Sequence, residues 1–336
     1  MFSRLITILG AVAVAVAVAV AVALSVASGA AGSAARGPVA KATRAQIIVT
    51  GLQDTTAIAF GDGQVFAAEV PYGPGHAGGA YLIRDGAATR LTGPNEAFGL
   101  AWHDGALYAS SQDQLVRMSG WNGQRFDRVR TIYTAPRGFP GFAGIGFGAD
   151  GRLYAGVRVA DNNDHSLTRA PFAYDLLSFA ASGRGPRVVA RGLREAWQLA
   201  FPAHSSSPLV SILGQDAPAG VKAPDLLVRP KPGQSYGFPS CNWVSARRCR
   251  GYAHPVKLFS PHTDPMSLVI VGDRLYFSEY GERPPQLPPR VVVMPLRGGR
   301  PRTVLSGFSA NLIGLGVDHG WLYVGDTAGN IYRARL

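Results

Sequence analysis

Apolar stretches that read as β-strands recur along the chain, each interrupted by a short polar corner. A tight turn and a further strand-like segment with a large apolar or aromatic pair follow, as in "LYASS", "LYFSE" and "LYVGD". The turns include Asp62-Gly63, Asp104-Gly105, Asp150-Gly151, Gly272-Asp273 and His319-Gly320. Asp-Gly between alternating apolar runs predicts a hairpin, because both turn positions tolerate a positive φ. The six recurring stretches are residues 47–60, 89–102, 130–147, 187–201, 254–271 and 302–317.

Six copies at a spacing of roughly 40–65 residues, with no amphipathic helix between them, predict an all-β fold. The simplest arrangement is a six-bladed β-propeller, whose radial packing protects the edges of its sheets. The last segment, "NIYRARL", has no strand after it, and "AQIIVTGL" has none before it. We expect these N- and C-terminal strands to pair and close the sixth blade, so the propeller should span residues 46–336.

The long loops fall on one face of such a propeller. In up-and-down blades the tight turns lie at one end, and the longer loops and blade-to-blade corners lie at the other. The longer loops are residues 71–79, 160–166, 214–224 and 279–289. Because loops on a rigid scaffold carry function most often, we expect the site on this long-loop face.

The N-terminus predicts export. Arg4 precedes an apolar run from Leu5 to Val26, and small residues suited to cleavage follow near position 35. Residues 1–35 are therefore a signal peptide or, since about 20 apolar residues can span a bilayer, a membrane anchor. Residues 36–45 would form a flexible leader. Either way the propeller is exported, secreted or held on the outer side of the membrane.

The composition limits the classes of binding partner that we expect for this protein. The net charge of +12 comes almost wholly from arginine, with only four lysines, and no nucleic-acid motif accompanies it. We expect no nucleic-acid partner and a solvated basic surface. In an exported chain the two cysteines, Cys241 and Cys249, are expected to form a disulfide.

Three motifs point to a family. The segments "GLREAWQLAF", "FGADGRLYAGV" and "KPGQSYGFPSC" resemble those of the glucose/sorbosone dehydrogenase-like propellers, whose enzymes use pyrroloquinoline quinone (PQQ) with calcium. The resemblance covers about residues 46–336 and implies a sugar as the small-molecule ligand. It implies that Arg194 faces the quinone, with Glu195 and Trp197 beside it, and that the loop with Gly214, Gln215 and Asp216 supplies calcium ligands. Asp225 matches an acidic position of the family.

Several departures argue against redox activity. Glu195 replaces a motif asparagine, Trp197 replaces a glutamine, and Pro140 occupies the position of the family's general-base histidine. Proline cannot take a proton. Trp197 could stack on a ligand or begin an inner strand and pack between blades. His76, His165 and His262 lie on the long-loop face, where surface roles are expected.

Two other functions remain open from the sequence. One is a non-catalytic propeller that binds a cell-envelope glycan. The other is a calcium-dependent lactonase, because the face carries several carboxylates that could converge on a hard cation. These carboxylates are Glu96, Glu195, Asp216, Asp264 and Glu279. The "GQSYG" segment fits a serine-hydrolase pattern, but prolines flank it, so Ser235 is interpreted as a turn residue.

Overall fold

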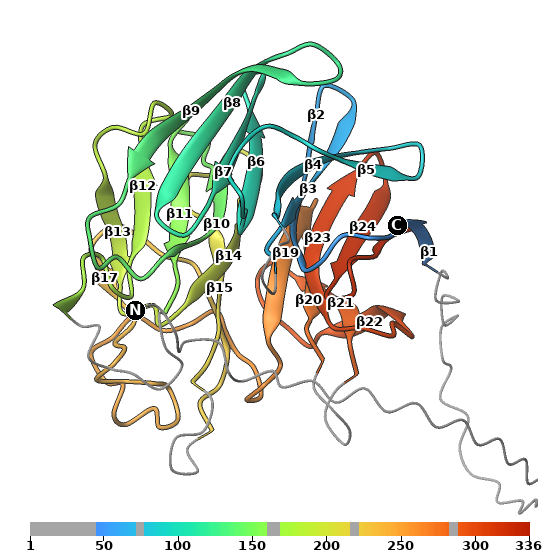
Figure 1. Cartoon of the computed structure of the whole chain (residues 1–336). Helices are drawn as coiled ribbons and strands as arrows, with labels where there is room; N and C mark the ends of the chain where they lie inside the picture. Colours follow the sequence, from blue (N-terminus) through green and yellow to red (C-terminus); the bar gives the residue numbers. More distant parts are fainter. Residues whose placement is uncertain (1–44, 72–76, 160–168, 216–221, 282–287) are drawn as a thin grey trace, which may run out of the picture. The chain divides into compact units, whose positions relative to one another are not determined.

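The structure, a computed structural model, describes residues 45–71, 77–159, 169–215, 222–281 and 288–336. In these residues the strands form six sheets (Figure 1), which we call blades 1 to 6. The predicted all-β six-bladed propeller is thereby confirmed. The apolar run from Leu5 to Val26 lies outside the described residues, and no helix in the described part is long and apolar enough to cross a membrane.

Blades 1 to 3 follow one another along the chain. Blade 1 comprises β2 (Thr55–Gly61), β3 (Gln64–Glu69), β4 (Gly79–Arg84) and β5 (Ala87–Arg90). Blade 2 comprises β6 (Gly99–His103), β7 (Ala106–Ser110), β8 (Gln114–Trp121) and β9 (Phe126–Thr134). Blade 3 comprises β10 (Phe142–Phe147), β11 (Leu153–Val157), β12 (Leu176–Phe179) and β13 (Arg187–Arg191).

Blades 4 to 6 complete the set. Blade 4 comprises β14 (Ala196–Ala200), β15 (Leu209–Ile212), β16 (Leu226–Val228) and β18 (Lys257–Leu258). Blade 5 comprises β19 (Pro265–Val271), β20 (Arg274–Glu279), β21 (Arg290–Pro295) and β22 (Arg302–Ser306). Blade 6 comprises β23 (Leu312–Asp318), β24 (Trp321–Asp326), β25 (Ile331–Arg335) and β1 (Gln46–Val49).

The propeller closes as predicted. β1 pairs antiparallel with β25, with Gln46 opposite Arg333 and Ile47 opposite Tyr332, and the two strands lie side by side in Figure 1. The inner strands contact one another in the order β2, β6, β10, β14, β19, β23 and back to β2. Apolar clusters lie between neighbouring blades, and the one shared by blades 5 and 6 includes Leu305, Leu312 and Tyr332. Burial of these apolar faces holds the blades together.

Blade 3 differs from the prediction of four antiparallel strands. A fifth strand, β17 (Gln234–Ser235), pairs parallel with β13, and Ala190 lies opposite Gln234. The long segment after β16 reaches back to the outer edge of blade 3 and covers it there, which protects an otherwise open edge. Ser235 therefore lies in a two-residue strand rather than a turn, and it is not a nucleophile on a strand-to-helix elbow.

The tight turns behave as the sequence predicts. Asp62 and Asp104 adopt φ values of 50° and 46°, and the glycine after each is also positive. The inner strands need glycine for a different reason. A Cβ at Gly144 on β10 would overlap the side chain of Gln198 on β14, so glycine lets neighbouring blades approach closely.

Candidate functional site

The inner strand of every blade begins at the end of the propeller where the second strand ends. We call this end the mouth and define it by the last paired residue of each second strand. In register these are Glu69, Ser110, Val157, Ile212, Glu279 and Asp326. The long loops predicted to carry function start here, directly after Glu69, Ile212 and Glu279.

The mouth has an acidic and a basic half. The second strands of blades 5, 6 and 1 end in buried carboxylates, those of Glu279, Asp326 and Glu69. On blade 3 Arg158 follows the second strand, and on blade 4 Arg194 immediately precedes the inner strand. The charged groups at the mouth therefore differ in sign between its two sides, although the carboxylates are buried.

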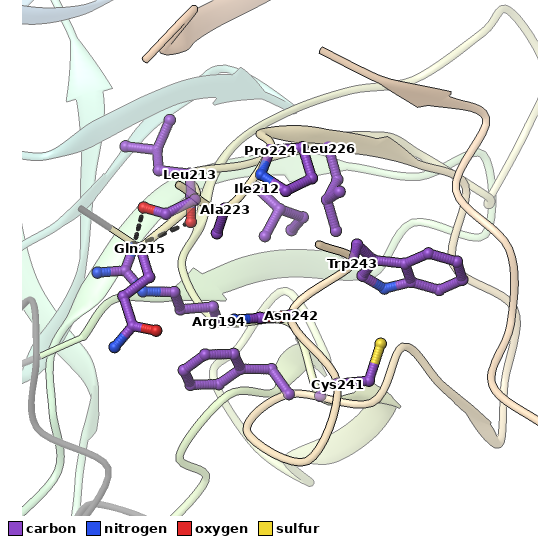
Figure 2. Close-up of a pocket in the computed structure, with 13 residues that line it drawn as sticks. Arg194, Ile212, Leu213, Gln215, Ala223, Pro224, Leu226, Cys241, Asn242 and Trp243 are labelled. Atoms are coloured by element: carbon purple, nitrogen blue, oxygen red, sulfur yellow. Dashed lines mark hydrogen bonds between the residues drawn. The ribbon is translucent and has the colours of Figure 1, made fainter. Parts of the chain in front are cut away.

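Arg194 is buried at the corner before β14, with only 5% of its surface exposed. Its Nη1 donates hydrogen bonds to the carbonyl oxygens of Leu213, at 3.0 Å, and Gly214, at 2.6 Å, as Figure 2 shows. The Glu195 carboxylate lies 3.6 Å from the same nitrogen. Arg194 thus ties the corner of blade 4 to the loop that follows β15.

Asp225 braces the same loop from the other side. Its carboxylate accepts hydrogen bonds from the backbone N–H of Gly214, at 2.6 Å, and of Asp264, at 2.9 Å. Burial raises the pKa of Asp225 to about 6, while the backbone donors and the nearby charge of His262 act in the opposite direction. The acidic position predicted from the family resemblance therefore has a positioning role here.

The structure describes only part of the loop that the resemblance implies as a calcium site. The carbonyl oxygen of Gly214, a predicted ligand, is the closer acceptor of the Arg194 guanidinium, so a calcium ion on that oxygen would lie beside a fixed cation. Gln215 is buried, and Asp216 lies outside the described residues. Within the described part, no group of three histidine, cysteine or acidic side chains could hold a metal ion.

The carboxylates expected to converge in a lactonase lie on the same face, and those described have different local contacts. Glu279 forms a 2.5 Å ion pair with Arg290, and the Glu96 carboxylate accepts a hydrogen bond from the backbone N–H of Gln112 at 2.9 Å. The backbone of Asp264 is held by Asp225, and Glu195 lies beside Arg194. Among the described residues no three acidic, histidine or cysteine side chains lie close enough to hold a metal ion, so the hypothesis of convergence on a cation gains no support from these four.

Trp197 is the second residue of β14, so the prediction that it begins an inner strand is confirmed. Its side chain is partly buried, and its Nε1–H is fully buried with no hydrogen-bond partner in the described residues. The next residue, Gln198, reaches across the centre of the propeller. Its Nε2 donates to the carbonyl oxygens of Thr56 on blade 1 and Phe98 before blade 2, both at 3.4 Å. The Gln198 side chain therefore lies across the central axis just below the mouth.

At the position that the resemblance assigns to a general base, Pro140 takes part in a hydrogen-bonded contact with Gln112. The carbonyl oxygen of Pro140 accepts a hydrogen bond from Nε2 of Gln112 at 2.9 Å. Arg158 donates to the Oε1 of Gln112, and its guanidinium lies 3.7 Å from the ring centre of Phe98. No titratable base stands at this position, and Arg158 supplies a cation instead.

A buried acid that the sequence did not predict lies at the junction of blades 6 and 1. Asp54 is 5% exposed and lies just before β2. Burial, together with the nearby charges of Asp326 and Glu69, raises the pKa of Asp54 from 3.8 to about 7. Asp54 is thus protonated in part near neutral pH. This protonation reduces the repulsion that a third negative charge beside Asp326 and Glu69 would cause.

A small cavity lies beside Arg194 (Figure 2). Arg194, Leu213, Gly214, Phe238 and Trp243 are among its lining residues, and Cys241 lies at its edge. Its volume for water is about 20 Å³, which holds roughly one molecule. The predicted disulfide between Cys241 and Cys249 is confirmed and secures the loop that forms this wall. In this form the cavity is too small for a ligand larger than water.

The remaining predicted residues are placed as follows. His262 lies close enough to Asp225 to influence its pKa, with a φ of 61° in the corner before β19. His76 and His165 lie outside the described residues.

Comparisons with known proteins support the fold. An aldose sugar dehydrogenase from Streptomyces coelicolor, in its PQQ-bound form, is 20% identical with a TM-score of 0.67, covering 86% of this chain and 96% of that one. In fold, the chain is similar to a PQQ-dependent sugar dehydrogenase. The predicted resemblance is confirmed at this level. No protein-family model and no curated protein sequence matches the chain.

Two further structures extend the similarity. The calcium structure of a family AA12 carbohydrate-active enzyme from Trichoderma reesei is 15% identical with a TM-score of 0.72, covering 88% of this chain and 95% of that one. A gluconolactonase from Xanthomonas campestris is 13% identical with a TM-score of 0.56, covering 88% and 90%. At these identities the likeness establishes the six-bladed propeller, and function has to be argued from the site.

A periodic signal could have revealed the missed residues. The second strands contain "VFAAE", "LYAS", "LYAGV", "LYFSE" and "LYVGD", and each of these segments ends at the mouth. Aligning them would have placed Glu69 and Asp326 at the mouth, with Arg158 directly after the end of its segment. Gln112 and Gln198 carry no such signal, because their partners lie far away in the sequence.

Proposed function

We propose that this protein is an exported sugar-binding propeller that holds its ligand at the mouth, against Arg194 and Trp197. The observation that carries the proposal is the buried Nε1–H of Trp197, which has no acceptor in the described residues. A buried donor of this kind calls for an acceptor from water or from a ligand. A sugar supplies hydroxyl oxygens for the donor and C–H faces for the indole ring.

The charges of the mouth support the same ligand class. Arg194 and Arg158 supply cations on one side, and the carboxylates of Glu69 and Asp326 lie on the other. Sugars and their acids carry hydroxyl groups that both donate and accept hydrogen bonds, so they can satisfy both halves. The sugar dehydrogenase and gluconolactonase among the structures of similar fold act in the same ligand class by their names.

Binding without oxidation follows from the residues at the two positions that matter most. Pro140 cannot accept a proton from a sugar hydroxyl, and its carbonyl oxygen is already bonded to Gln112. The Gly214 carbonyl is oriented toward Arg194 rather than toward a calcium ion. We therefore derive no redox step, and the glycan of the cell envelope or a soluble sugar is the proposed partner.

The test is a titration of the full chain with aldoses, aldonic acids and envelope glycan fragments, read by calorimetry. We expect binding that weakens by about tenfold in Trp197→Phe, which removes the N–H and keeps a ring. Trp121→Phe is the matched control, because Trp121 also has a buried Nε1–H without a partner in the described residues but lies at the opposite end of blade 2.

Three results would overturn the proposal. One is equal binding by Trp197→Phe and the unsubstituted chain. Another is dye reduction with an aldose that requires added PQQ and calcium and is lost in Arg194→Ala, which would make the protein a dehydrogenase. The third is chelator-sensitive hydrolysis of a lactone that weakens in Glu195→Gln, which would make it a lactonase.

A further inference from the structure

A second hollow lies at the end of blade 5 opposite the mouth. β20 runs from Arg274 to Glu279, and Glu279 is at the mouth, so Arg274 marks the opposite end. The hairpin turn before Arg274 and the turn between β21 and β22 both lie at this end. The hollow offers about 350 Å³ to water-sized molecules and is lined by Asp273, Arg274, Val293, Met294, Pro295, Arg297, Arg300 and Arg302.

Strand register brings two of the arginines onto one side of the blade. Arg274 lies opposite Pro295, and Arg302 lies opposite Val293. Pro295 and Val293 are two residues apart on β21, so their side chains point to the same side of the sheet, and their cross-strand partners do likewise. Arg274 and Arg302 therefore flank a strip of β21 from its two edges.

The turn after β21 adds the other two arginines. The sequence "LRGGRPR" places Arg297 and Arg300 on either side of two glycines, whose φ values are 93° and 147°. The backbone N–H of Gly298 donates to the carbonyl oxygen of Pro295 at 3.0 Å, which closes a tight turn. The turn is joined to the neighbouring hairpin, because the N–H of Leu296 donates to the carbonyl oxygen of Asp273 at 2.9 Å.

The positive charge of the hollow is not neutralised within the described residues. Four arginines and one aspartate line it. Asp273 is 93% exposed and lies 3.9 Å from Arg274, an ion pair that solvent weakens. Arg297, Arg300 and Arg302 form no ion pair with a carboxylate of the described part. The four guanidinium groups around the hollow repel one another, weakly because all four residues are exposed, and a bound anion would remove that repulsion.

We propose that this hollow binds a phosphate group, as a compact phosphoester or as one unit of a phosphodiester polymer. Guanidinium groups match the oxygens of phosphate in pairs, and several arginines converging on a hollow give a geometry that a single surface charge does not. The apolar side chains of Val293 and Pro295, on the same side of β21 as Arg274 and Arg302, provide a surface for the organic part of the ligand. The site lies at the other end of the propeller from Trp197 and does not depend on the proposed sugar site.

The experiment titrates the full chain with inorganic pyrophosphate and, separately, with a short glycerol-phosphate polymer, at constant ionic strength. We expect Arg297→Ala/Arg300→Ala to weaken binding by about tenfold or more, since two charged hydrogen-bond donors are lost. Arg128→Ala/Arg130→Ala on β9 is the matched control, because it removes the same charge from exposed positions outside the hollow. Tighter binding of pyrophosphate identifies a compact phosphoester as the ligand, and tighter binding of the polymer identifies a phosphodiester chain.

Arg297→Lys/Arg300→Lys separates paired recognition from charge alone. It keeps both positive charges on an intact turn, so we expect a loss smaller than that of the alanine pair but clear against the control. If both alanine pairs weaken binding equally, or if the lysine pair binds as well as the unsubstituted chain, the basic surface acts as a whole and the proposal is wrong. If neither pyrophosphate nor the glycerol-phosphate polymer binds, the proposal is also wrong.

Discussion

The guanidinium of Arg194 and the carbonyl oxygen of Gly214 lie 2.6 Å apart in a hydrogen bond that connects the corner before β14 with the loop after β15. The Asp225 carboxylate holds the N–H of the same glycine. Both the N–H and the carbonyl oxygen of Gly214 are therefore hydrogen-bonded. The wall of the mouth at blade 4 is thus formed without a ligand. This preorganisation lowers the entropy that a ligand has to overcome.

Replacing Arg194 should loosen that wall. Arg194→Gln removes a buried charge and the Nη1 donor that serves two carbonyl oxygens, so we expect the free energy of unfolding to fall by about 1.5–3 kcal/mol. Urea denaturation measures the change. Arg187→Gln, at an exposed position on β13, is the control and should leave stability nearly unchanged. Equal stability of the two variants would contradict the role given to Arg194.

Stability should depend on pH through Asp54. Its pKa is about 7 in the folded protein and 3.8 when unfolded, so the folded state binds more protons between these values. This group's contribution is therefore greatest at low pH and is lost as pH rises through 7. Burial also raises the pKa of Asp175 and Asp225 to about 6, which adds to the slope in the same direction.

Asp54→Asn isolates that contribution. The variant keeps the size of the side chain and removes its titration, so we expect its melting temperature to fall less between pH 5 and pH 8 than that of the unsubstituted chain. Thermal unfolding across this range is the measurement, and Asp62→Asn, at an exposed turn, should behave like the unsubstituted chain. Parallel curves for all three proteins would refute the assignment.

The disulfide should contribute measurably to stability. Cys241 and Cys249 are both buried and are separated by eight positions. Closing a loop of that length restricts the unfolded chain by about 2–3 kcal/mol in the chain-entropy account. Cys241→Ser/Cys249→Ser should lower the free energy of unfolding accordingly in urea titrations. Reductant should destabilise the unsubstituted chain and have no effect on the double variant.

If pairing of the terminal strands closes the ring of blades, substitutions of Val49 and Val129 should differ in their effect on thermal stability. Val49 on β1 is 3% exposed and packs into the cluster shared by blades 6 and 1, whereas Val129 on β9 is 39% exposed. Val49→Asp places an unpaired charge in that cluster and should abolish cooperative thermal unfolding or lower its midpoint sharply. Val129→Asp should be close to neutral. Similar effects of both would show that pairing of the terminal strands does not hold the ring.

The blades and their closure could be predicted because their signals are local. An Asp-Gly turn such as Asp62-Gly63 and an alternating strand such as "LYFSE" each depend on residues adjacent in the chain, and the repeat multiplies the evidence. The pairing of β1 with β25 followed from a count, since the last blade lacked a fourth strand and the first strand of the domain belonged to no blade of its own. The fifth strand of blade 3 escaped prediction, because Gln234–Ser235 is too short to carry a pattern of its own.

The candidate site divides in the same way. The resemblance implied that Arg194 and Glu195 lie at one corner and Gly214 in a loop of the same site, and the structure brings the corner and the loop together. The sequence could not show that the Gly214 carbonyl accepts a hydrogen bond from Arg194, since that depends on orientation and not on residue type. Pro140 was correctly identified as no base, but its partner Gln112 and the neighbouring Arg158 were not foreseen.

By itself the sequence determined the number of blades, the strand that closes them, the disulfide and the face that carries the long loops. Each of these depends on turn chemistry, alternation or spacing that neighbouring residues specify. Only the tertiary structure decided that Gln198 spans the centre, that Asp54 lies beside two other acids, and that four arginines surround a hollow on blade 5. These arrangements join residues from separate strands or blades, and their distances are set by how β-sheets twist and pack around an axis.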